Sequence, residues 1–330
     1  MKVVRIYGKR DLRLSDEPIP TPAPGMKLLR VKSVGICGSD LHWYSEGNIG
    51  TAKLTRPLVL GHEFSAVLEN GERMAVDPAL PCGKCESCLK GHPNICPNVK
   101  FAGGDEDGAL RDYIPWAEEC IFPIPDNISD EDGAMLEPLG VAIHSVDLAH
   151  LKPGMTVGVF GCGPIGLLII QLARLCGASN ILATDVLPHR VEAAKACGAT
   201  HAWCVQEQLE PQAWQAATHG RGVDVAFDVS GAKGAVNDAV DTAIPGGKVI
   251  LAGIPEDDQT GFKASVARRK GLTLKLVRRM KHTYPRAIDL VIRGLVDVRS
   301  LVSHRFPLEG ASEAFESAEK REGLKVVINL

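Results

Sequence analysis

The second half of the chain alternates short apolar runs with longer amphipathic stretches. Residues 157–160, 181–184, 223–229 and 248–252 are brief, largely apolar runs of strand length. Between them, residues 161–177 and 188–197 have the composition and spacing of helices. Strands that alternate with helices of about 10 to 15 residues are typical of βαβ units around a parallel sheet. We therefore expect an α/β domain in this half.

The first half has a different pattern. Residues 1 to about 25 read as strand followed by a proline-rich bridge at 17–25, and short apolar runs broken by Gly, Pro, Asn and Asp continue to about residue 125. Few helical periods occur there, which predicts an all-β, barrel-like first unit. Residues 284–330 read as helix, irregular chain, helix and a last strand at 324–330. This tail could extend the α/β sheet or return to the first unit.

The length, charge and cysteine content of the chain limit the classes of protein to which it could belong. A chain of 330 residues is long for one core, so two domains are expected. Lysine and arginine number 37 against 40 acids, which leaves no basic field for nucleic acid or an anionic membrane. No signal peptide and no apolar run of about 18 residues are visible. Ten cysteines without a secretion signal favour a reduced, cytoplasmic protein over a disulfide framework.

A glycine motif follows the first strand of the α/β half. Gly161, Gly163 and Gly166 form G-x-G-x-x-G with Pro164 and Ile165, between a strand and a helix, and Asp185 ends the next strand. This context predicts a dinucleotide site with the pyrophosphate at the helix N-terminus. A carboxylate at Asp185 would bind both ribose hydroxyls and repel a 2′-phosphate, which favours NAD. Arg190 is close enough in sequence to help accept NADP instead.

Two groups of possible metal ligands lie in the first half. Four cysteines, Cys82, Cys85, Cys88 and Cys96, have the spacing of a closed, structural Zn²⁺ cage. Cys37, His62, Glu63 and Glu137 are scattered, and together they could form an open, catalytic zinc site. By spacing alone, a buried cysteine is more often a small hydrophobe, and a His-Glu pair is more often hydrogen-bonded core.

The chain resembles the zinc-dependent medium-chain alcohol dehydrogenases, in their sorbitol (polyol) dehydrogenase branch, over essentially its whole length. Beyond the four cysteines, the resemblance rests on GICGSDLH, GHEFSA, MLEPLGVAIHSV, VFGCGPIG, TDVLPHR, FDVSG and RRMKHTYPRAIDLV. It implies a GroES-like β-rich catalytic domain at residues 1–143 and 284–330. A doubly wound Rossmann domain at 144–283 would be inserted between these two parts.

The resemblance also implies roles for single residues. Cys37 and His62 match ligands of the catalytic zinc, Glu63 matches a ligand or near-ligand, and Glu137 stands where simpler alcohol dehydrogenases have a second cysteine. Ser39 and His42 match a proton relay, although Ser39 with Asp40 could equally cap a helix. Tyr44, Glu137 and Arg279 are candidates for substrate hydroxyls, and Arg279 could instead serve the cofactor.

The implied reaction is reversible oxidation of a secondary alcohol of a polyol such as sorbitol or xylitol to the ketose, with hydride transfer to NAD. Dehydrogenases of idonate, galactitol or L-threonine are alternatives with the same motifs. A non-catalytic zinc-lobe interaction protein is a further alternative, but it leaves Cys37, His62 and Glu137 unexplained. By analogy with the family, the chain is expected to form a homodimer or homotetramer. Ala66, where the family usually has glycine, is a departure that depends on the local φ.

Overall fold

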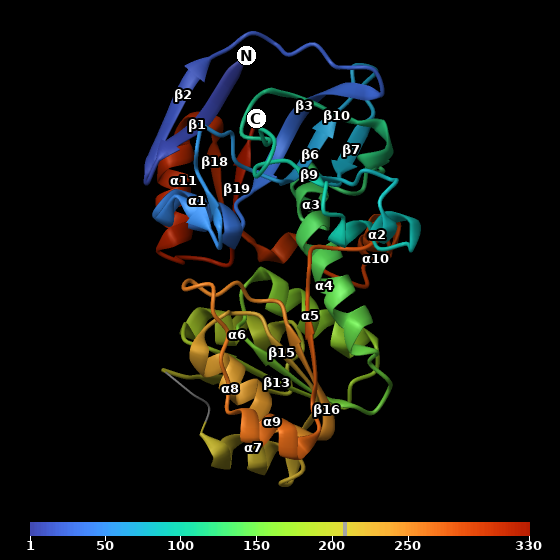
Figure 1. Cartoon of the computed structure of the whole chain (residues 1–330), viewed down its shortest axis with the longest axis vertical. Helices are drawn as coiled ribbons and strands as arrows, with labels where there is room; N and C mark the ends of the chain where they lie inside the picture. Colours follow the sequence, from blue (N-terminus) through green and yellow to red (C-terminus); the bar gives the residue numbers. More distant parts are fainter. Residues whose placement is uncertain (207–209) are drawn as a thin grey trace. The chain divides into compact units, whose positions relative to one another are not determined.

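The computed structural model describes residues 1–206 and 210–330 (Figure 1). Its contacts divide the chain into two compact units. Unit 1 contains Met1–Gly140 and Lys281–Leu330, and unit 2 contains Val141–Met280. The long helix α4 (Leu136–Ala149) contains the change from unit 1 to unit 2.

Unit 1 is built on a seven-stranded sheet in the order β11-β7-β6-β3-β19-β18, with β10 paired to β3. The strands of this sheet are β3 (Met26–Gly35), β6 (Glu63–Val67), β7 (Arg73–Val76), β10 (Tyr113–Ala117), β11 (Ile121–Pro123), β18 (Val302–Pro307) and β19 (Lys325–Asn329). Two-stranded ladders are formed by β1 (Lys2–Gly8) with β2 (Asp11–Asp16), β4 (Asn48–Ile49) with β5 (Ala52–Lys53), and β8 (Ala79–Leu80) with β9 (Lys100–Phe101). The prediction of a β-rich first unit is therefore confirmed.

Helical segments complete unit 1. They are α1 (Gly38–Glu46), α2 (Glu86–Leu89), η1 (Pro93–Ile95), η2 (Glu118–Cys120), α3 (Asp130–Ala134), α10 (Tyr284–Ile292), η3 (Arg299–Leu301), η4 (Leu308–Gly310) and α11 (Ala311–Glu319). The sequence pattern did not predict α1. It begins at Cys37 as N-cap, and the Asp40 carboxylate accepts from the Cys37 N–H at 3.0 Å. Asp40 thus caps the helix, as one reading of this segment allowed, but the N-cap is Cys37 rather than Ser39.

The C-terminal tail returns to unit 1. Strand β19 pairs antiparallel with β3, with Ile328 opposite Val34, and parallel with β18. Figure 1 shows these red strands beside the blue β3. The alternative in which the tail extends the α/β sheet is therefore wrong, and the stretch expected to be irregular contains β18. Periodicity could not decide this, because pairing partners are chosen by contacts distant in sequence.

Unit 2 is a six-stranded parallel sheet in the order β14-β13-β12-β15-β16-β17. The strands are β12 (Thr156–Phe160), β13 (Asn180–Asp185), β14 (His201–Cys204), β15 (Val223–Asp228), β16 (Ala243–Leu251) and β17 (Thr273–Leu276). Helices α5 (Pro164–Leu175), α6 (Pro188–Ala196), α7 (Pro211–Thr218), α8 (Lys233–Thr242) and α9 (Ala264–Lys270) connect them (Figure 1). This is the 3-2-1-4-5-6 order of a doubly wound dinucleotide-binding sheet. The sequence pattern predicted the parallel sheet, and the family resemblance implied the doubly wound fold.

Ala66 shows how the unit 1 sheet tolerates its departure from the motif. It lies in the middle of β6, is fully buried, and has a negative φ. Strand geometry accepts an alanine without strain there. The β6–β7 connection is also short, closed by the Leu68 N–H on the Glu72 carbonyl at 2.9 Å with Gly71 at φ 88°.

Candidate active site

The structure brings the thiols of the four-cysteine loop close together, and their role as zinc ligands stays a prediction. The Sγ atoms of Cys82, Cys85, Cys88 and Cys96 all lie within 4.8 Å of one another, and α2 and η1 carry the intervening chain. The β8–β9 ladder closes the base of the loop. Four thiol sulfurs at this spacing would fill all four positions of a tetrahedral, structural zinc site.

The electrostatics of this loop fit a cation. Backbone N–H groups of Lys84 and Cys85 lower the pKa of Cys82 to about 6, which favours the thiolate that binds metal. Burial and the neighbouring thiols Cys85 and Cys96 raise the pKa of Cys88 to about 12. Thiolates crowded at this distance repel each other, and a bound Zn²⁺ would remove that repulsion.

A second group of possible ligands is assembled from separate elements of unit 1. Cys37 at the start of α1, His62 just before β6 and Glu63 at its first position offer ligand atoms within 4.8 Å of one another. His62 and Glu63 are 4% and 1% exposed. Glu63 is the first residue of β6, and His62 directly precedes it. One thiolate, one imidazole and one carboxylate fit a zinc site with three protein ligands.

Asp40 orients the histidine of this group, a role that the sequence analysis did not assign. The Asp40 carboxylate lies 3.4 Å from His62 Nδ1 and also accepts from the backbone N–H of Gly61 at 3.2 Å. Burial would lower the pKa of His62, but Asp40 and Cys37 raise it well above its usual value. Nδ1 faces Asp40, so Nε2 is the nitrogen left for a metal, in the carboxylate–histidine arrangement common at metal sites.

Glu137 lies near this group without belonging to its compact core. Among the described residues, the close set contains Cys37, His62 and Glu63 but not Glu137. Glu137 lies in the first turn of α4 and is 5% exposed. Burial raises its pKa to about 8, with the Glu63 carboxylate adding to the rise and His62 opposing it. Its predicted roles as ligand, catalytic group and substrate contact stay predictions.

Helix α1 places part of the predicted proton relay beside His62. Ser39 Oγ lies 3.4 Å from His62 Nε2. His42 lies one turn further along α1, and its Nδ1 lies 3.0 Å from Glu46 Oε1. Residues three and four apart share one face of a helix, so Ser39, His42 and Glu46 follow one line along α1. The relay itself stays a prediction.

Tyr44 lies in the hydrophobic core of unit 1 and not on the face of α1 that carries Ser39. Its ring is 3% exposed and packs on Phe315 of α11 with the centroids 5.2 Å apart. Its position on α1 is about 140° around the helix from Ser39, at 100° a residue. This placement in the hydrophobic core gives no support to the predicted contact with a substrate hydroxyl, because core packing fixes the ring away from the Ser39 face.

The glycine turn of unit 2 has the geometry its sequence predicts. Gly161 has φ 106°, a value L side chains rarely adopt, and a Cβ there would lie 2.9 Å from Ser230. A Cβ on Gly166 would overlap the carbonyl oxygen of Gly161, so the helix can approach the strand only with glycine. Gly163 is the N-cap of α5, followed by Pro164 at the first helical position and Ile165. The free N–H groups of a 12-residue helix therefore open at this turn.

Asp185 and Arg190 lie together at this turn. One Asp185 oxygen accepts from the Cys162 N–H at 2.8 Å and the other accepts from the Leu187 N–H at 3.0 Å. Arg190 Nη1 lies 4.0 Å from Asp185, and it is the nearest atom to a Cβ built on Gly163. Arg279 follows β17 in unit 2 with φ 55°. Its predicted cofactor or substrate role stays a prediction.

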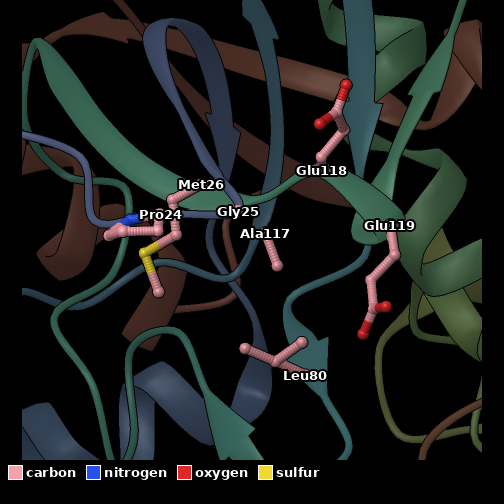
Figure 2. A pocket seen from close by; sticks show the side chains of 7 residues that line it. All are labelled: Pro24, Gly25, Met26, Leu80, Ala117, Glu118 and Glu119. Atoms are coloured by element: carbon pink, nitrogen blue, oxygen red, sulfur yellow. The ribbon is translucent and has the colours of Figure 1, made fainter.

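A hollow on the surface of unit 1 lacks polar groups that converge on one point. It has a volume of about 550 Å³ and is lined by Pro24, Gly25, Met26, Leu80, Ala117, Glu118 and Glu119. Figure 2 shows the carboxylates of Glu118 and Glu119 pointing in different directions. A ligand site needs polar groups that converge on one point, so the metal-ligand groups remain the better candidate sites.

In the described residues, none of the helices is long and apolar enough to cross a membrane.

Comparisons with known proteins agree with this geometry. The family model for the alcohol dehydrogenase GroES-like domain matches residues 23–126, and the model for zinc-binding dehydrogenases matches residues 164–293. The chain is 36% identical to the sorbitol dehydrogenase of Bacillus subtilis (strain 168), over 99% of this chain and 97% of that protein.

Two solved structures of Escherichia coli proteins share the fold over the whole chain. The L-idonate 5-dehydrogenase of strain K-12 superposes with a TM-score of 0.92 at 28% identity, covering 100% of this chain and 98% of that one. A protein of strain CFT073, described as a short chain alcohol dehydrogenase complexed with NADH, has a TM-score of 0.91 at 29% identity, covering 100% and 99%. With both family models matched and two ligand sets assembled, the chain belongs to the zinc-dependent alcohol dehydrogenase family and is an oxidoreductase.

Proposed function

We propose that this protein is a zinc-dependent, NAD-linked polyol dehydrogenase that reversibly oxidises a secondary alcohol of a sugar alcohol to the ketose. The observation that carries the proposal is the buried group of Cys37, His62 and Glu63, whose three different donors fit a catalytic zinc with one position left for substrate. Similarity to a sorbitol dehydrogenase over the whole chain supports the polyol substrate. Zinc bound there would act as a Lewis acid on the alcohol oxygen.

The protein's own residues would then handle the proton. Ser39 Oγ, 3.4 Å from His62 Nε2, is placed to accept the proton of an alcohol held beside this group. His42 would pass the proton to solvent, because its side chain is partly exposed and an imidazole can both accept and donate a proton. Glu46 would accept from His42 Nδ1 and so leave Nε2 as the nitrogen that takes the proton.

Unit 2 would hold the cofactor. Helix α5 offers free N–H groups and a partial positive charge for the pyrophosphate, and the missing side chain of Gly163 lets it approach. Asp185 would bind the ribose hydroxyls, which favours NAD, and its contact with Arg190 partly neutralises that arginine. The catalytic and cofactor domains are proposed as residues 1–143 with 284–330 and residues 144–283, a division that the two compact units support.

We further propose a cytoplasmic homo-oligomer, a dimer or tetramer. None of the ten cysteines is paired in a disulfide in the structure, which suits a reducing compartment. Leu89 and Ile95 on the four-cysteine loop and Leu276 on the edge strand β17 are 76%, 52% and 77% exposed. Large apolar side chains in such positions are candidates for subunit contacts.

A substrate panel tests the proposal. Purified enzyme is assayed for NADH formation with sorbitol, xylitol, galactitol, L-idonate and L-threonine, with NAD⁺ and NADP⁺ in parallel. We expect the polyols and NAD⁺ to give the highest kcat/KM. Turnover of threonine or idonate without turnover of sorbitol or xylitol would refute the polyol assignment. One zinc per chain and no turnover at all would favour the non-catalytic zinc-lobe protein.

A further inference from the structure

A buried lysine from the C-terminal strand contacts the candidate metal group. Lys325, the first residue of β19, is 3% exposed, and its ammonium contacts Glu63 Oε2. Glu63 is 1% exposed, so both charges of this pair are removed from water. A buried charge is stable only when paired. The pair therefore places each side chain, because neither can turn away without leaving its partner unpaired.

The backbone around the pair leaves room for it. A Cβ built on Gly35, at the end of β3, would overlap Glu63 Oε2 and lie 2.9 Å from Lys325 Cε. The φ of Gly35 is not positive, so a side chain is excluded here by space and not by backbone conformation. Because Gly35 has no side chain, there is room for Lys325 to contact the Glu63 carboxylate.

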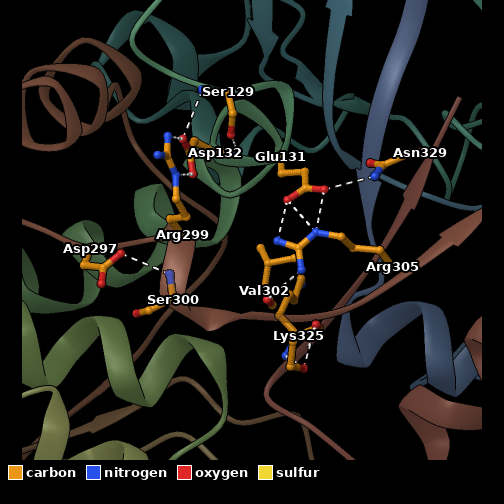
Figure 3. Close-up of polar contacts among 11 residues, drawn as sticks. Ser129, Glu131, Asp132, Asp297, Arg299, Ser300, Val302, Arg305, Lys325 and Asn329 are labelled. Atoms are coloured by element: carbon orange, nitrogen blue, oxygen red, sulfur yellow. Dashed lines mark hydrogen bonds and ion pairs between the residues drawn. The ribbon is translucent and has the colours of Figure 1, made fainter.

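Strand β19 is itself held in place. The Ser303 hydroxyl donates to the Lys325 carbonyl at 3.0 Å and accepts from the Lys325 N–H at 3.2 Å. The Glu131 carboxylate of α3 accepts from Arg305 at 2.8 Å and from Asn329 Nδ2 at 3.0 Å (Figure 3). Because both ends of β19 are held by these bonds, Lys325 reaches Glu63 from a rigid strand.

We propose that Lys325 is a positioning residue that holds one oxygen of Glu63 and thereby keeps the carboxylate in the Cys37–His62–Glu63 group as a metal ligand. This inference rests on the proposed function, because it assigns Glu63 to the catalytic zinc. Groups that contact a metal ligand fix its orientation, and their loss typically lowers metal affinity about 10- to 100-fold. Lys325 acts through Glu63 and touches neither substrate nor cofactor in this scheme.

The test replaces Lys325 by Met, which keeps the length of the side chain and removes its charge. Metal affinity of the intact protein is measured by competition with a chelator, using Zn²⁺ and Co²⁺. The Cys37→Ala variant, which keeps the four-cysteine loop, supplies the baseline to subtract. We expect K325M to lose about 10- to 100-fold in affinity at the Cys37 site and to shift its Co²⁺ absorption bands. The control K32M alters a lysine of β3 that bonds the Leu330 carbonyl, and it should match the wild type.

A double-mutant cycle separates positioning from a general structural role. If Lys325 acts through Glu63, K325M added to the Glu63→Gln variant will cause no further loss of affinity. This double variant also removes both buried charges, so it remains informative if K325M alone folds poorly. The Gly35→Ala variant should reproduce the spectral shift with both charges present. Equal losses from K325M in both backgrounds, or wild-type spectra in K325M and G35A, would overturn the inference. Wild-type protein without metal at the Cys37 site would instead refute the proposed function.

Discussion

The two ligand groups of unit 1 are built in opposite ways. The four cysteines of the loop lie within 15 residues, between 82 and 96, on a segment closed by its own two-stranded ladder. Cys37, His62 and Glu63 are brought together by α1 and β6 and are joined by Lys325 from the far end of the chain. Local spacing makes the first group, whereas sheet pairing makes the second. The stronger sequence signal therefore marks the group whose four protein ligands leave no position for substrate.

The two ligand groups also differ in how deeply they are buried and in how many charged partners surround them. Three of the four loop cysteines are partly exposed, while His62 and Glu63 are buried among charged partners that include Asp40 and Lys325. Perturbed ionisable groups with specific partners are typical of functional sites. A closed thiolate loop needs only its own backbone, and a reactive site needs support from several elements.

The largest expected effect is on turnover, and it distinguishes the Cys37–His62–Glu63 group from the four-cysteine loop. Replacing Cys37 by Ala should remove one of two zinc ions per chain and lower kcat/KM by about 10³-fold, because a Lewis-acid metal supplies several kcal/mol. Metal analysis and steady-state kinetics measure both. The control Cys204→Ala alters an exposed thiol outside both groups and should leave both values unchanged. Two zinc ions and normal turnover in C37A would contradict the assignment of the catalytic site.

The next effect is on stability. Replacing Cys96 by Ser should also remove one zinc ion, but from the loop, and should lower the free energy of unfolding by about 3 kcal/mol, since a structural metal contributes folding energy. Turnover per folded molecule at low temperature should remain within a few-fold of wild type. Thermal unfolding with metal analysis measures this, with Cys204→Ser as the control. A loss of turnover as large as that of C37A would make the two groups functionally equivalent.

The same difference between local and distant contacts decides which features could be predicted from the sequence. The clustering of the loop thiols, the glycine turn at Gly161 and the strands β12, β13, β15 and β16 were predicted, because each carries a pattern within its own segment. Strands β14 and β17 of unit 2 were not predicted. Helix α1, strand β18 and the return of the tail to β3 were missed or left open, since their formation depends on distant partners. Lys325 carries no local signal at all, and only its pairing with Glu63 reveals it.

The smallest effect concerns a buried carboxylate of α3, the helix whose Glu131 bonds Asn329 of β19. Asp132 of α3 is 2% exposed and receives the Arg299 guanidinium at 2.5 Å and the Ser129 N–H at 3.0 Å (Figure 3). Burial would raise the pKa of Asp132, but these donors hold it below its usual value. A carboxyl whose folded pKa is depressed contributes stability above its unfolded pKa, near 3.9, and loses it as the pH falls through the folded pKa.

Asp132→Asn should therefore destabilise the protein by about 2 kcal/mol at pH 5 to 7, the range for hydrogen bonds to a charged group. The difference from wild type should shrink as the pH falls below about 4, because the unfolded wild-type carboxyl then takes up a proton, and it should be lost once the pH is below the folded pKa. Equilibrium unfolding of both proteins over this range measures it, and acid release of metal is common to both and cancels in the difference. Glu309→Gln, an exposed partner of Lys2, is the control and should show no change. A difference that stays constant down to pH 3 would mean that Asp132 acts through its size and packing, so that the contact between α3 and the segment before β18 needs no charge.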